Sequence, residues 1–485
     1  MLNTEVGYQR RDFAVMNWVE KKVIVLGAAR QGIAIARYLA RHGAEVTLND
    51  RRTLDEFQAA REELERFAVS QAAKPVNWVC GGHPLELLDS ADLLCISGGV
   101  PLELPIVVEA LRREIPVTND SQIFLEAAPC RTIGITGSAG KTTTTTLVGR
   151  IAEAALRQEP MTAGFGRVWV GGNIGTPLIT VVDEMAPTDL AILELSSFQL
   201  EIMTRSPNIA AVLNITPNHM DRHRTMQAYI GAKTRILTYQ TRQDTAILNR
   251  DDAGAWELAD QVQGELVAFG VNPASGRKSA FLRESGVYLR GDDRESFVLA
   301  RAQIRLRGEH NLLNVLAACA IAMAAGIPVE AMRAGVEGFS GVPHRLEYVR
   351  TWGGADWFND SIATAPERSM AAIRSFDESL VLLAGGRDKD LPWEDFARLA
   401  CQRVGHLILF GEAAGKIEEA IQRACPAASH TKLMRRSNLE EAVLAAAGVV
   451  QPGDVVLLSP GGTSFDEFRD FEERGECFKR LVKLL

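Results

Sequence analysis

Short apolar runs alternate with longer amphipathic segments along most of this 485-residue chain. That pattern is typical of parallel strands joined by crossover helices. Apolar runs of strand length predict buried strands at 22–27, 45–50, 93–97, 116–118, 130–136, 190–194, 209–215, 244–249, 381–384, 406–410 and 454–459. Periodic segments predict helices at 33–42, 226–237 and 310–323. Between residues 264 and 305 the pattern is shorter and more alternating, which favours antiparallel strands.

Two boundaries divide this pattern into three parts. A chain of this length is too long for one hydrophobic core. Pro129 and Cys130 mark the first boundary, and residues 338–343 mark the second. The fold class expected is therefore α/β, with three consecutive domains and a Rossmann-like first and last domain. Their expected extents are 1–129, with an extension at 1–20, then 130–341 and 342–485.

Composition narrows the class of protein. The chain is 46% hydrophobic and 24% charged, and it has no apolar run long enough to span a membrane. Its first 20 residues lack the apolar block of a secretory signal. A net charge of −8 argues against a general nucleic-acid binder. Seven scattered cysteines without a Cys-x-x-Cys pair favour reduced thiols over a disulfide framework. We therefore expect a cytoplasmic enzyme or NTPase with no nucleic-acid or membrane partner.

A glycine-rich segment that ends in Lys141-Thr142 follows the strand predicted at 130–136. Its glycines let backbone N–H groups converge on phosphate oxygens, Lys141 supplies positive charge, and the Thr142 hydroxyl can reach Mg²⁺. The next helix adds its positive dipole end to the same anion. The segment departs from the common form at Ile135, because its glycines stand at 134 and 137. The alternative is a turn without a ligand, but the lysine, the threonines and the strand favour a nucleotide-phosphate site.

A second glycine turn, Gly27-Ala-Ala-Arg-Gln-Gly32, follows the first predicted strand, and Asp50 ends the second strand. The turn imitates a dinucleotide fingerprint but has two glycines where the full pattern has three. A tight strand-to-helix turn is the alternative, and it would still favour an anion at the helix start. Because no hydride-transfer residues follow, we expect a nucleotide-diphosphate site rather than a nicotinamide site.

Polar groups follow two strands of the middle third. Glu194 ends a predicted strand, where a P-loop protein places an acidic group that binds Mg²⁺; the alternative is a cap of the next helix. His219, Asp221 and His223 lack the supporting spacing of a zinc site. We expect His219 in a magnesium site and His223 as a solvated helix residue. Spacing alone would leave Lys233 on the polar face of its helix.

Five short polar segments gather near strands of the last third: 344–345, 359–360, 364–367, 385–389 and 459–466. The first two flank a predicted strand pair. The third reads as a capping box with proline in the first helical turn. Each loop alone is most simply a surface loop, but the carboxyl ends of strands are where open α/β sheets bind ligands.

In this order, the motifs resemble the Mur ligases of peptidoglycan synthesis. The resemblance rests on Gly137-Ser-Ala-Gly-Lys-Thr, Leu193-Glu-Leu-Ser-Ser-Phe-Gln, Asn214-Ile-Thr-Pro-Asn-His-Met-Asp-Arg, His310-Asn-x-x-Asn, His344-Arg, Asn359-Asp and Ser459-Pro-x-x-x-Ser-Phe-Asp. The Ser-Ser-Phe-Gln run and the Phe471-Glu-Glu-Arg-Gly stretch resemble in particular the branch that ligates glutamate to UDP-N-acetylmuramoyl-L-alanine. The resemblance begins near residue 20 and reaches the end of the chain.

The resemblance implies an ATP-dependent, ADP-forming amide ligase. ATP phosphorylates the carboxylate of UDP-N-acetylmuramoyl-L-alanine, and the amino group of glutamate then displaces phosphate. Catalysis rests on positioning and charge neutralisation, with no protein nucleophile. The implied cofactors are ATP and Mg²⁺ at two sites, and the implied assembly is a monomer.

The same resemblance assigns roles to residues. Those implied in catalysis are Lys141, His219 and Lys233. Those implied in ATP binding are Gly137, Ser138, Ala139, Gly140, Lys141, Thr142, Thr143, Asn311, Asn314, Arg345 and Asp360. The implied Mg²⁺ ligands are Thr142, Glu194, His219 and Lys233, the last as a metal-bridging carbamate. The UDP-linked substrate is assigned to Arg30, Gln31, Asp50, Arg51, Gly99 and Asn173. Glutamate is assigned to Thr364, Lys389, Ser464, Phe465 and Phe471.

One segment departs from the family's pattern. Residues 359–365 usually read Asn-Asp-Ser-Lys-Ala-Thr-Asn in the D-glutamate ligases, whereas Ile362 and Ala365 stand here. The lost cation and the lost amide leave the stereochemistry of the added glutamate open. We expect D-glutamate, with the L-glutamate-adding variant as the alternative.

Three other kinds of protein share parts of the pattern. Folylpolyglutamate synthase has related second and third parts but starts almost at its phosphate loop, so the domain before Pro129 counts against it. A nicotinamide dehydrogenase would leave Lys141 and Glu194 without a role. A non-catalytic NTPase switch would hydrolyse ATP without an acceptor.

Overall fold

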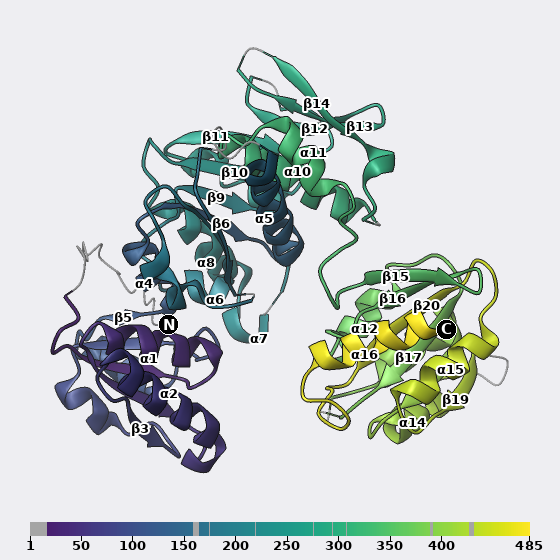
Figure 1. The fold of residues 1–485 in the computed structure, drawn as a ribbon, viewed down its shortest axis with the longest axis horizontal. Helices are drawn as coiled ribbons and strands as arrows, with labels where there is room; N and C mark the ends of the chain where they lie inside the picture. Colours follow the sequence, from purple (N-terminus) through teal and green to yellow (C-terminus); the bar gives the residue numbers. More distant parts are fainter. Residues whose placement is uncertain are drawn as a thin grey trace. The chain divides into compact units, whose positions relative to one another are not determined.

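The computed structural model describes residues 17–158, 164–173, 175–218, 220–274, 276–292, 294–306, 308–388, 391–425 and 431–485. His219 and Lys389, both assigned to the site from the sequence, lie outside these residues, and so does the side chain of Asp221. The strands of the described residues form three sheets (Figure 1). The chain divides into two compact units, Met1–Phe339 with the first two sheets and Ser340–Leu485 with the third. A separation of the first unit into two domains at residues 129–130 stays a prediction.

The first sheet has five parallel strands in the order β3-β2-β1-β4-β5, the Rossmann order without its sixth strand. Its strands are β1 (Lys22–Leu26), β2 (Glu45–Asp50), β3 (Asn77–Cys80), β4 (Leu93–Ile96) and β5 (Val117–Thr118). Its helices are α1 (Arg30–Arg41), α2 (Gln58–Gln71), α3 (Pro105–Arg112) and α4 (Asp120–Ala127).

The second sheet has nine strands in the order β14-β13-β12-β11-β10-β9-β6-β8-β7. Its strands are β6 (Arg131–Thr136), β7 (Val168–Gly172), β8 (Leu190–Glu194), β9 (Ile209–Val212), β10 (Thr245–Asn249), β11 (Glu265–Phe269), β12 (Ser279–Arg283), β13 (Gly286–Arg290) and β14 (Glu295–Ala300). Its helices are α5 (Lys141–Gln158), α6 (Ser197–Leu200), α7 (Met220–His223), α8 (Met226–Thr238), α9 (Ala253–Trp256), α10 (Glu309–Ala324) and α11 (Val329–Val336).

The third sheet has six strands in the order β15-β16-β20-β17-β18-β19. Its strands are β15 (Glu347–Trp352), β16 (Ala355–Asn359), β17 (Leu380–Gly385), β18 (Val404–Phe410), β19 (Lys432–Arg435) and β20 (Val455–Gly461). Its helices are α12 (Pro366–Ile373), α13 (Glu394–Arg403), α14 (Ala414–Ala424), α15 (Leu439–Val449) and α16 (Phe471–Leu484). All neighbouring strands are parallel except β15 and β16.

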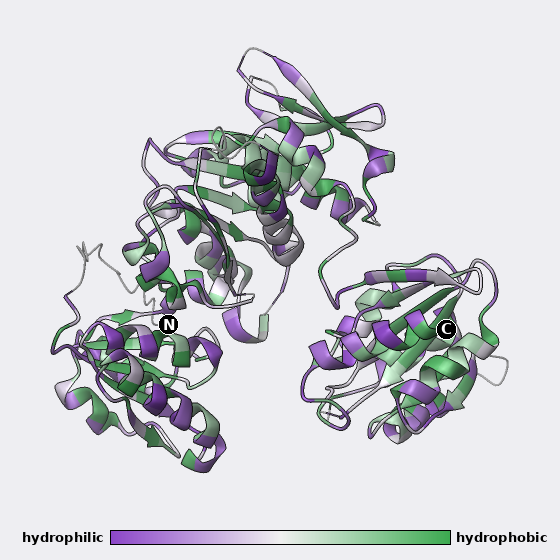
Figure 2. Ribbon diagram, viewed as in Figure 1, coloured by the Kyte–Doolittle hydropathy of each residue, from purple (hydrophilic) through white to green (hydrophobic). Residues whose placement is uncertain are grey.

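Both faces of the third sheet are covered by helices. One apolar cluster joins the sheet to α12, α13 and α14, with Ile373, Phe396 and Ile417 among its members. A second apolar cluster, built from the strand side chains on the opposite face of the sheet, joins the sheet to α15 and α16. Val443 and Phe478 are among its members. Figure 2 shows largely hydrophobic strands and helices that also carry hydrophilic residues. A parallel sheet covered by helices on both sides needs apolar residues on both faces, and the strands of this sheet have them. The expected α/β fold class is confirmed.

One local prediction is confirmed in part and another is wrong. The antiparallel pairing expected across 264–305 is confirmed for β12, β13 and β14, but β11 runs parallel to both β10 and β12. A capping box was expected at 364–367, but α12 has Ala365 at its N-cap and no side-chain cap. The helix does begin with the predicted proline, Pro366, whose missing N–H is no loss in the first turn.

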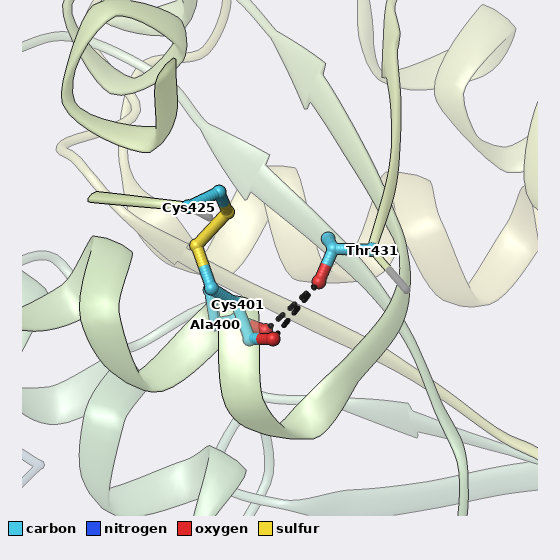
Figure 3. Close-up of a disulfide and its surroundings, with 4 residues drawn as sticks. All are labelled: Ala400, Cys401, Cys425 and Thr431. Carbon is cyan, nitrogen blue, oxygen red and sulfur yellow. Dashed lines mark hydrogen bonds between the residues drawn. A yellow bond between two sulfur atoms is a disulfide. The ribbon is translucent and has the colours of Figure 1, made fainter. Parts of the chain in front are cut away.

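The cysteine prediction is wrong for one pair. Cys401, in α13, and Cys425, just after α14, form a disulfide with their Cα atoms 5.5 Å apart (Figure 3). Beside it, the Thr431 hydroxyl donates to the carbonyl oxygens of Ala400 and Cys401, each at 3.4 Å. The two cysteines are separated by 24 positions and become neighbours only because α13 packs against α14. Cysteine spacing along a chain does not reveal a contact of that kind.

Candidate active site

The predicted phosphate loop connects β6 to α5. Gly140 has a φ of +82°, and a Cβ added there would lie 2.2 Å from Oδ1 of Asn314. A side chain at this position would therefore be strained and would also displace Asn314. The glycine lets α10 place Asn314 directly against the loop, and Asn314 Nδ2 in turn donates to Asn311 Oδ1 at 3.0 Å.

A second segment braces the phosphate loop from the end of β9. The N–H of Ser138 donates to the Asn214 carbonyl at 3.0 Å, and the N–H of Ala139 donates to Asn214 Oδ1 at 2.8 Å. The Ser138 hydroxyl donates to the Thr216 carbonyl at 2.8 Å and lies 2.9 Å from the Tyr229 hydroxyl. Sequence reasoning quoted Asn214 as part of a motif but gave it no role, and it missed Tyr229. One feature of the sequence could have indicated Tyr229: the motif that begins at Asn214 lies only a few residues before the helix that carries both Tyr229 and Lys233.

Glu194 meets the phosphate loop at the carboxyl end of β8. The Thr142 hydroxyl donates to Glu194 Oε2 at 2.8 Å, and Asn173 Nδ2 donates to Oε1 at 3.1 Å. Lys141 Nζ donates to the Gly137 carbonyl at 2.7 Å. The alternative that Glu194 caps the next helix is wrong, because Ser196 caps α6. Glu194 ends β8, and Thr142 lies in the first turn of α5, which follows the neighbouring strand β6. A carboxylate and a hydroxyl are oxygen ligands of the kind that Mg²⁺ prefers, so this pair fits the predicted ion.

Lys233 lies in the interior beside this pair, contrary to the position that spacing alone would give it. The residue is 1% exposed, and its Nζ donates to Thr136 Oγ1 at 3.3 Å and lies 4.8 Å from the centre of the Tyr229 ring. Burial and the nearby charge of Lys141 lower the pKa of Lys233 to about 6, although Glu194 acts in the opposite direction. At neutral pH its amine is therefore largely uncharged. An uncharged amine is the form that adds CO₂ to give a carbamate.

The glycine turn of the first sheet is organised around Asp50. Asp50 Oδ2 accepts the Ala28 N–H at 2.8 Å, and both carboxylate oxygens accept hydrogen bonds from Arg52. Burial opposes ionisation of Asp50, but the hydrogen bonds from Arg52 and Ala28 prevail and hold its pKa at about 2. The Arg52 guanidinium also lies 4.4 Å from the centre of the Phe57 ring. The sequence motif pointed to Arg51 here, and Arg52 was not predicted.

The other residues assigned to the UDP-linked substrate lie in two places. Arg30 and Gln31 begin α1, and Gly99 is exposed in the loop after β4. Arg51 is an exposed residue after β2. Asn173, in contrast, lies with Glu194 at the end of the second sheet. The first unit therefore brings together the phosphate loop, Thr143, Asn311, Asn314, Glu194, Asn173 and Lys233, with Asp50, Arg30, Gln31 and Gly99 on the first sheet.

Asp360 directly follows β16 in the second unit. Its carboxylate accepts the Ser459 hydroxyl at 2.7 Å and the Leu346 N–H at 3.2 Å. Burial raises the pKa of Asp360 to about 7, although Ser459, Leu346 and Arg345 act against the shift. Arg345, predicted beside it, is exposed before β15. As expected, the segments 344–345 and 359–360 flank a strand pair.

The described residues assigned to glutamate, which exclude Lys389, lie in segments that follow β16 and β20, two neighbouring strands of the third sheet. Arg474 of α16, fully buried, joins these segments, because it donates to the carbonyls of Ser361, Gly462 and Thr463 at 2.9–3.2 Å. The Ser361 hydroxyl donates to the Phe471 carbonyl at 2.8 Å. Thr364, Ser464, Phe465 and Phe471 therefore belong to segments at one edge of the sheet, with Ser464 buried and Phe465 62% exposed. Sequence reasoning missed Arg474, which it quoted only as part of a motif.

His223 was expected to be solvated, and that prediction is wrong. The residue is 5% exposed, its Nε2 lies 2.9 Å from the Ser197 hydroxyl, and its ring stacks on Phe198. Its partners come from α6, which no spacing along α7 could reveal. In the part of the chain that is described, no three His, Cys, Asp or Glu side chains are grouped to hold a metal ion. None of the described helices is both long and apolar enough to cross a membrane.

Comparison with known proteins gives matches along almost the entire chain. Three family models match: "Mur ligase MurD-like, N-terminal domain" over residues 21–119, "Mur ligase middle domain" over 135–322, and "Mur ligase, glutamate ligase domain" over 344–462. A UDP-N-acetylmuramoylalanine–D-glutamate ligase of Symbiobacterium thermophilum is 41% identical over 96% of this chain and 99% of its own length. The same-named protein of Acidobacterium capsulatum is 38% identical over 95% and 96%.

Solved structures agree at the level of the fold. The UDP-N-acetylmuramate–alanine ligase of Thermotoga maritima superposes with a TM-score of 0.53 at 18% identity, covering 96% of this chain and 99% of that one. A MurF structure from Acinetobacter baumannii gives a TM-score of 0.53 at 19% identity, covering 95% and 92%. Matched by its motifs, by three family models and by relatives over nearly its whole length, the chain belongs to the Mur ligase family.

Proposed function

We propose that the protein joins D-glutamate to UDP-N-acetylmuramoyl-L-alanine and converts ATP to ADP and phosphate. The observation that carries the proposal is the group formed by Lys141, Thr142 and Glu194 beside a buried Lys233 of lowered pKa. A phosphate loop with an oxygen pair for Mg²⁺ suits phosphoryl transfer. The names of full-length relatives, 36–41% identical, supply the substrates. They name D-glutamate, so the L-glutamate variant becomes an outcome of the test.

The reaction needs two steps that balance without a protein nucleophile. A carboxylate oxygen of the alanine attacks the γ-phosphorus of ATP, and the bond to the bridging oxygen of ADP breaks. The uncharged amino group of glutamate then attacks the acyl carbon, loses a proton, and phosphate leaves with the former carboxylate oxygen. Lys141 and the N–H groups at the start of α5 neutralise and orient the transferred phosphate. Asn311, Asn314, Arg345 and Asp360 are proposed to hold the rest of ATP.

Thr142, Glu194, His219 and Lys233 are proposed to hold two Mg²⁺ ions, which supply charge neutralisation at the phosphates when bound. Lys233 is proposed to take part as its carbamate, because a carbamate would add a negative charge and two oxygen ligands that the amine lacks. Two features of its surroundings support that assignment. Its pKa of about 6 leaves the amine uncharged, and its contact with Thr136 places Nζ beside the phosphate loop.

The binding sites of the UDP-linked substrate and of glutamate are assigned mainly to the first and the third sheet. Arg30, Gln31, Arg51 and Gly99 are proposed to hold the UDP part, with Asp50 fixing the turn and Asn173 reaching toward the sugar-peptide part. Thr364, Lys389, Ser464, Phe465 and Phe471 are proposed to hold glutamate. The same proposal includes a cytoplasmic monomer without nucleic-acid or membrane partners. Light scattering on the purified protein tests its oligomeric state.

The test offers the purified protein ATP, Mg²⁺ and UDP-N-acetylmuramoyl-L-alanine with D-glutamate or with L-glutamate. ADP, phosphate and the ligated product are measured in each reaction. We expect one molecule of ligated product for each ADP in the reaction with D-glutamate and none in the reaction with L-glutamate. Phosphate should be released only when both UDP-N-acetylmuramoyl-L-alanine and D-glutamate are present. Turnover with L-glutamate alone would overturn the D assignment. Phosphate release at full rate without acceptors would favour an NTPase switch instead.

A further inference from the structure

The loop after β4 lies against the glycine turn of the first sheet. The Ser97 hydroxyl donates to the Gly27 carbonyl at 3.0 Å, and the Val100 N–H donates back to the Ser97 carbonyl at 2.9 Å. A Cβ added at Gly98 would lie 3.6 Å from Oε1 of Gln31. The loop 97–100 therefore lies directly beside the turn that is proposed to hold the UDP part.

Arg222 of α7 holds this same loop from the second sheet. Its Nη1 donates to the Gly99 carbonyl at 3.2 Å, and its Nη2 donates to the Val100 carbonyl. The guanidinium lies 4.7 Å from the centre of the Phe198 ring of α6. Two hydrogen bonds from a cation packed on an aromatic ring make a directional contact, because the planar guanidinium fixes both donors at once.

A neighbouring arginine makes a much weaker contact with the same region. Arg224 pairs with Glu103 at 3.5 Å, and the two side chains are 75% and 53% exposed. An exposed pair of that kind contributes little to stability or position. Arg222 and Arg224 therefore provide a matched comparison, with one built contact and one surface ion pair two residues apart.

We propose that Arg222 is a positioning residue for the UDP-linked substrate, which rests on the function proposed above. It holds the carbonyls of Gly99 and Val100 toward α7, and this fixes the backbone of the loop that faces Gln31. Arg222 also follows the segment whose Asn214 and Thr216 brace the phosphate loop. One arginine thus joins the proposed UDP-binding loop to the segment that shapes the ATP site.

The test compares Arg222→Gln and Arg222→Lys with Arg224→Gln as the control. The dissociation constant of UDP is measured by calorimetry, and KM and kcat are measured for each substrate. Loss of two charge-assisted hydrogen bonds should weaken UDP binding and raise KM for the UDP-linked substrate about tenfold in Arg222→Gln. Lysine, which can keep one donor, should recover part of that loss. KM for ATP, the melting temperature and all properties of Arg224→Gln should stay near the wild-type values.

The outcomes separate this inference from the proposed function. If the wild type ligates glutamate and Arg222→Gln keeps the wild-type UDP affinity and KM, the positioning role is wrong. A general loss of ATP affinity and melting temperature in both Arg222 variants would show a structural role instead. If the wild type binds UDP, loses that affinity in Arg222→Gln, and ligates nothing, the inference holds and the proposed function fails.

Discussion

The pKa values of three partly or fully buried residues of the site are shifted in different ways, because different groups replace the water that burial removes. Asp50 has hydrogen bonds from Arg52 and a backbone N–H, and its pKa falls to about 2. Asp360 has fewer compensating donors, and its pKa rises to about 7. Lys233 has a single hydroxyl and an aromatic ring, and its pKa falls to about 6. Residue type and position after a strand identified Asp50 and Asp360, and the family resemblance identified Lys233. Only the packing around each residue determines its charge.

Replacing Lys233 by alanine should remove most activity while the fold persists. The change deletes the proposed metal-bridging carbamate, so we expect kcat to fall by at least about 100-fold. Lys278→Ala is the control, because that lysine pairs with Glu265 and Asp292 on the surface of the same unit. In the wild type, labelling with ¹³C-bicarbonate should give a carbamate signal by NMR that Lys233→Ala lacks. Full turnover of Lys233→Ala would refute the assigned role.

The lowered pKa of Lys233 also predicts how stability depends on pH. Between pH 6 and 10 the unfolded chain binds a proton at this lysine that the folded chain does not, so stability should rise with pH in that window. Lys233→Met has no ionisable group at this position, so it lacks this pH dependence. In CO₂-free buffer, the unfolding free energy of the wild type minus that of Lys233→Met should increase by about 1 kcal/mol per pH unit from pH 6.5 to 8.5. A flat difference in urea titrations would mean that the folded-state pKa is not lowered.

At the scale of elements, every strand and helix that was predicted by its range is present, because apolar runs and periodicity report which positions are buried. The strands β3, β7 and β19 were not predicted. Periodicity could not predict that β11 is parallel to β12, because pairing direction depends on where the chain returns. It also missed the contacts of Tyr229 with the phosphate loop and of Arg222 with the loop after β4. Those contacts join elements that are far apart in sequence. Both contacts belong to the candidate site. Its motifs were therefore predicted from the sequence, but the residues that hold those motifs in place were not.

The phosphate loop requires glycine at 140 for two separate reasons, and a control isolates them. Gly140 and Gly326 have φ values of +82° and +81°, but an added Cβ meets Asn314 at the first and nothing within 4 Å at the second. Gly326→Ala should therefore cost only backbone strain, about 1 kcal/mol of unfolding free energy. Gly140→Ala should show the same strain and in addition raise KM for ATP at least about tenfold. Equal effects of the two variants on ATP would contradict the contact with Asn314.

The disulfide between α13 and α14 predicts a measurable thiol count. Without reductant, the denatured protein should titrate five thiols, those of Cys80, Cys95, Cys130, Cys319 and Cys477. With reductant it should titrate all seven. Because the bond closes a short loop, Cys425→Ser should lower the unfolding free energy of the second unit by about 3 kcal/mol. Seven thiols without reductant would contradict the bond.

For the whole molecule, the order of motifs predicted more than any single motif did. Each of three largely parallel sheets has one such feature at the carboxyl ends of its strands: a glycine turn in the first, a phosphate loop in the second and a set of polar loops in the third. Lys141 and Glu194 make the second sheet a phosphate site, and the first sheet before Pro129 distinguishes the chain from ligases that start at that loop. The stereochemistry of glutamate was beyond sequence reasoning, because Ile362 and Ala365 break the family's pattern where the amino acid is expected. The names of the relatives favour D-glutamate there.

The central claim, that ATP activates the carboxylate of the UDP-linked substrate, is tested most directly by following oxygen. UDP-N-acetylmuramoyl-L-alanine carrying ¹⁸O in both carboxylate positions is turned over with ATP and D-glutamate, and the released phosphate is examined by mass spectrometry. An acyl phosphate transfers one carboxylate oxygen to the phosphate that leaves. We predict one ¹⁸O atom in each phosphate and one in the new amide. Unlabelled phosphate accompanied by product would contradict the account.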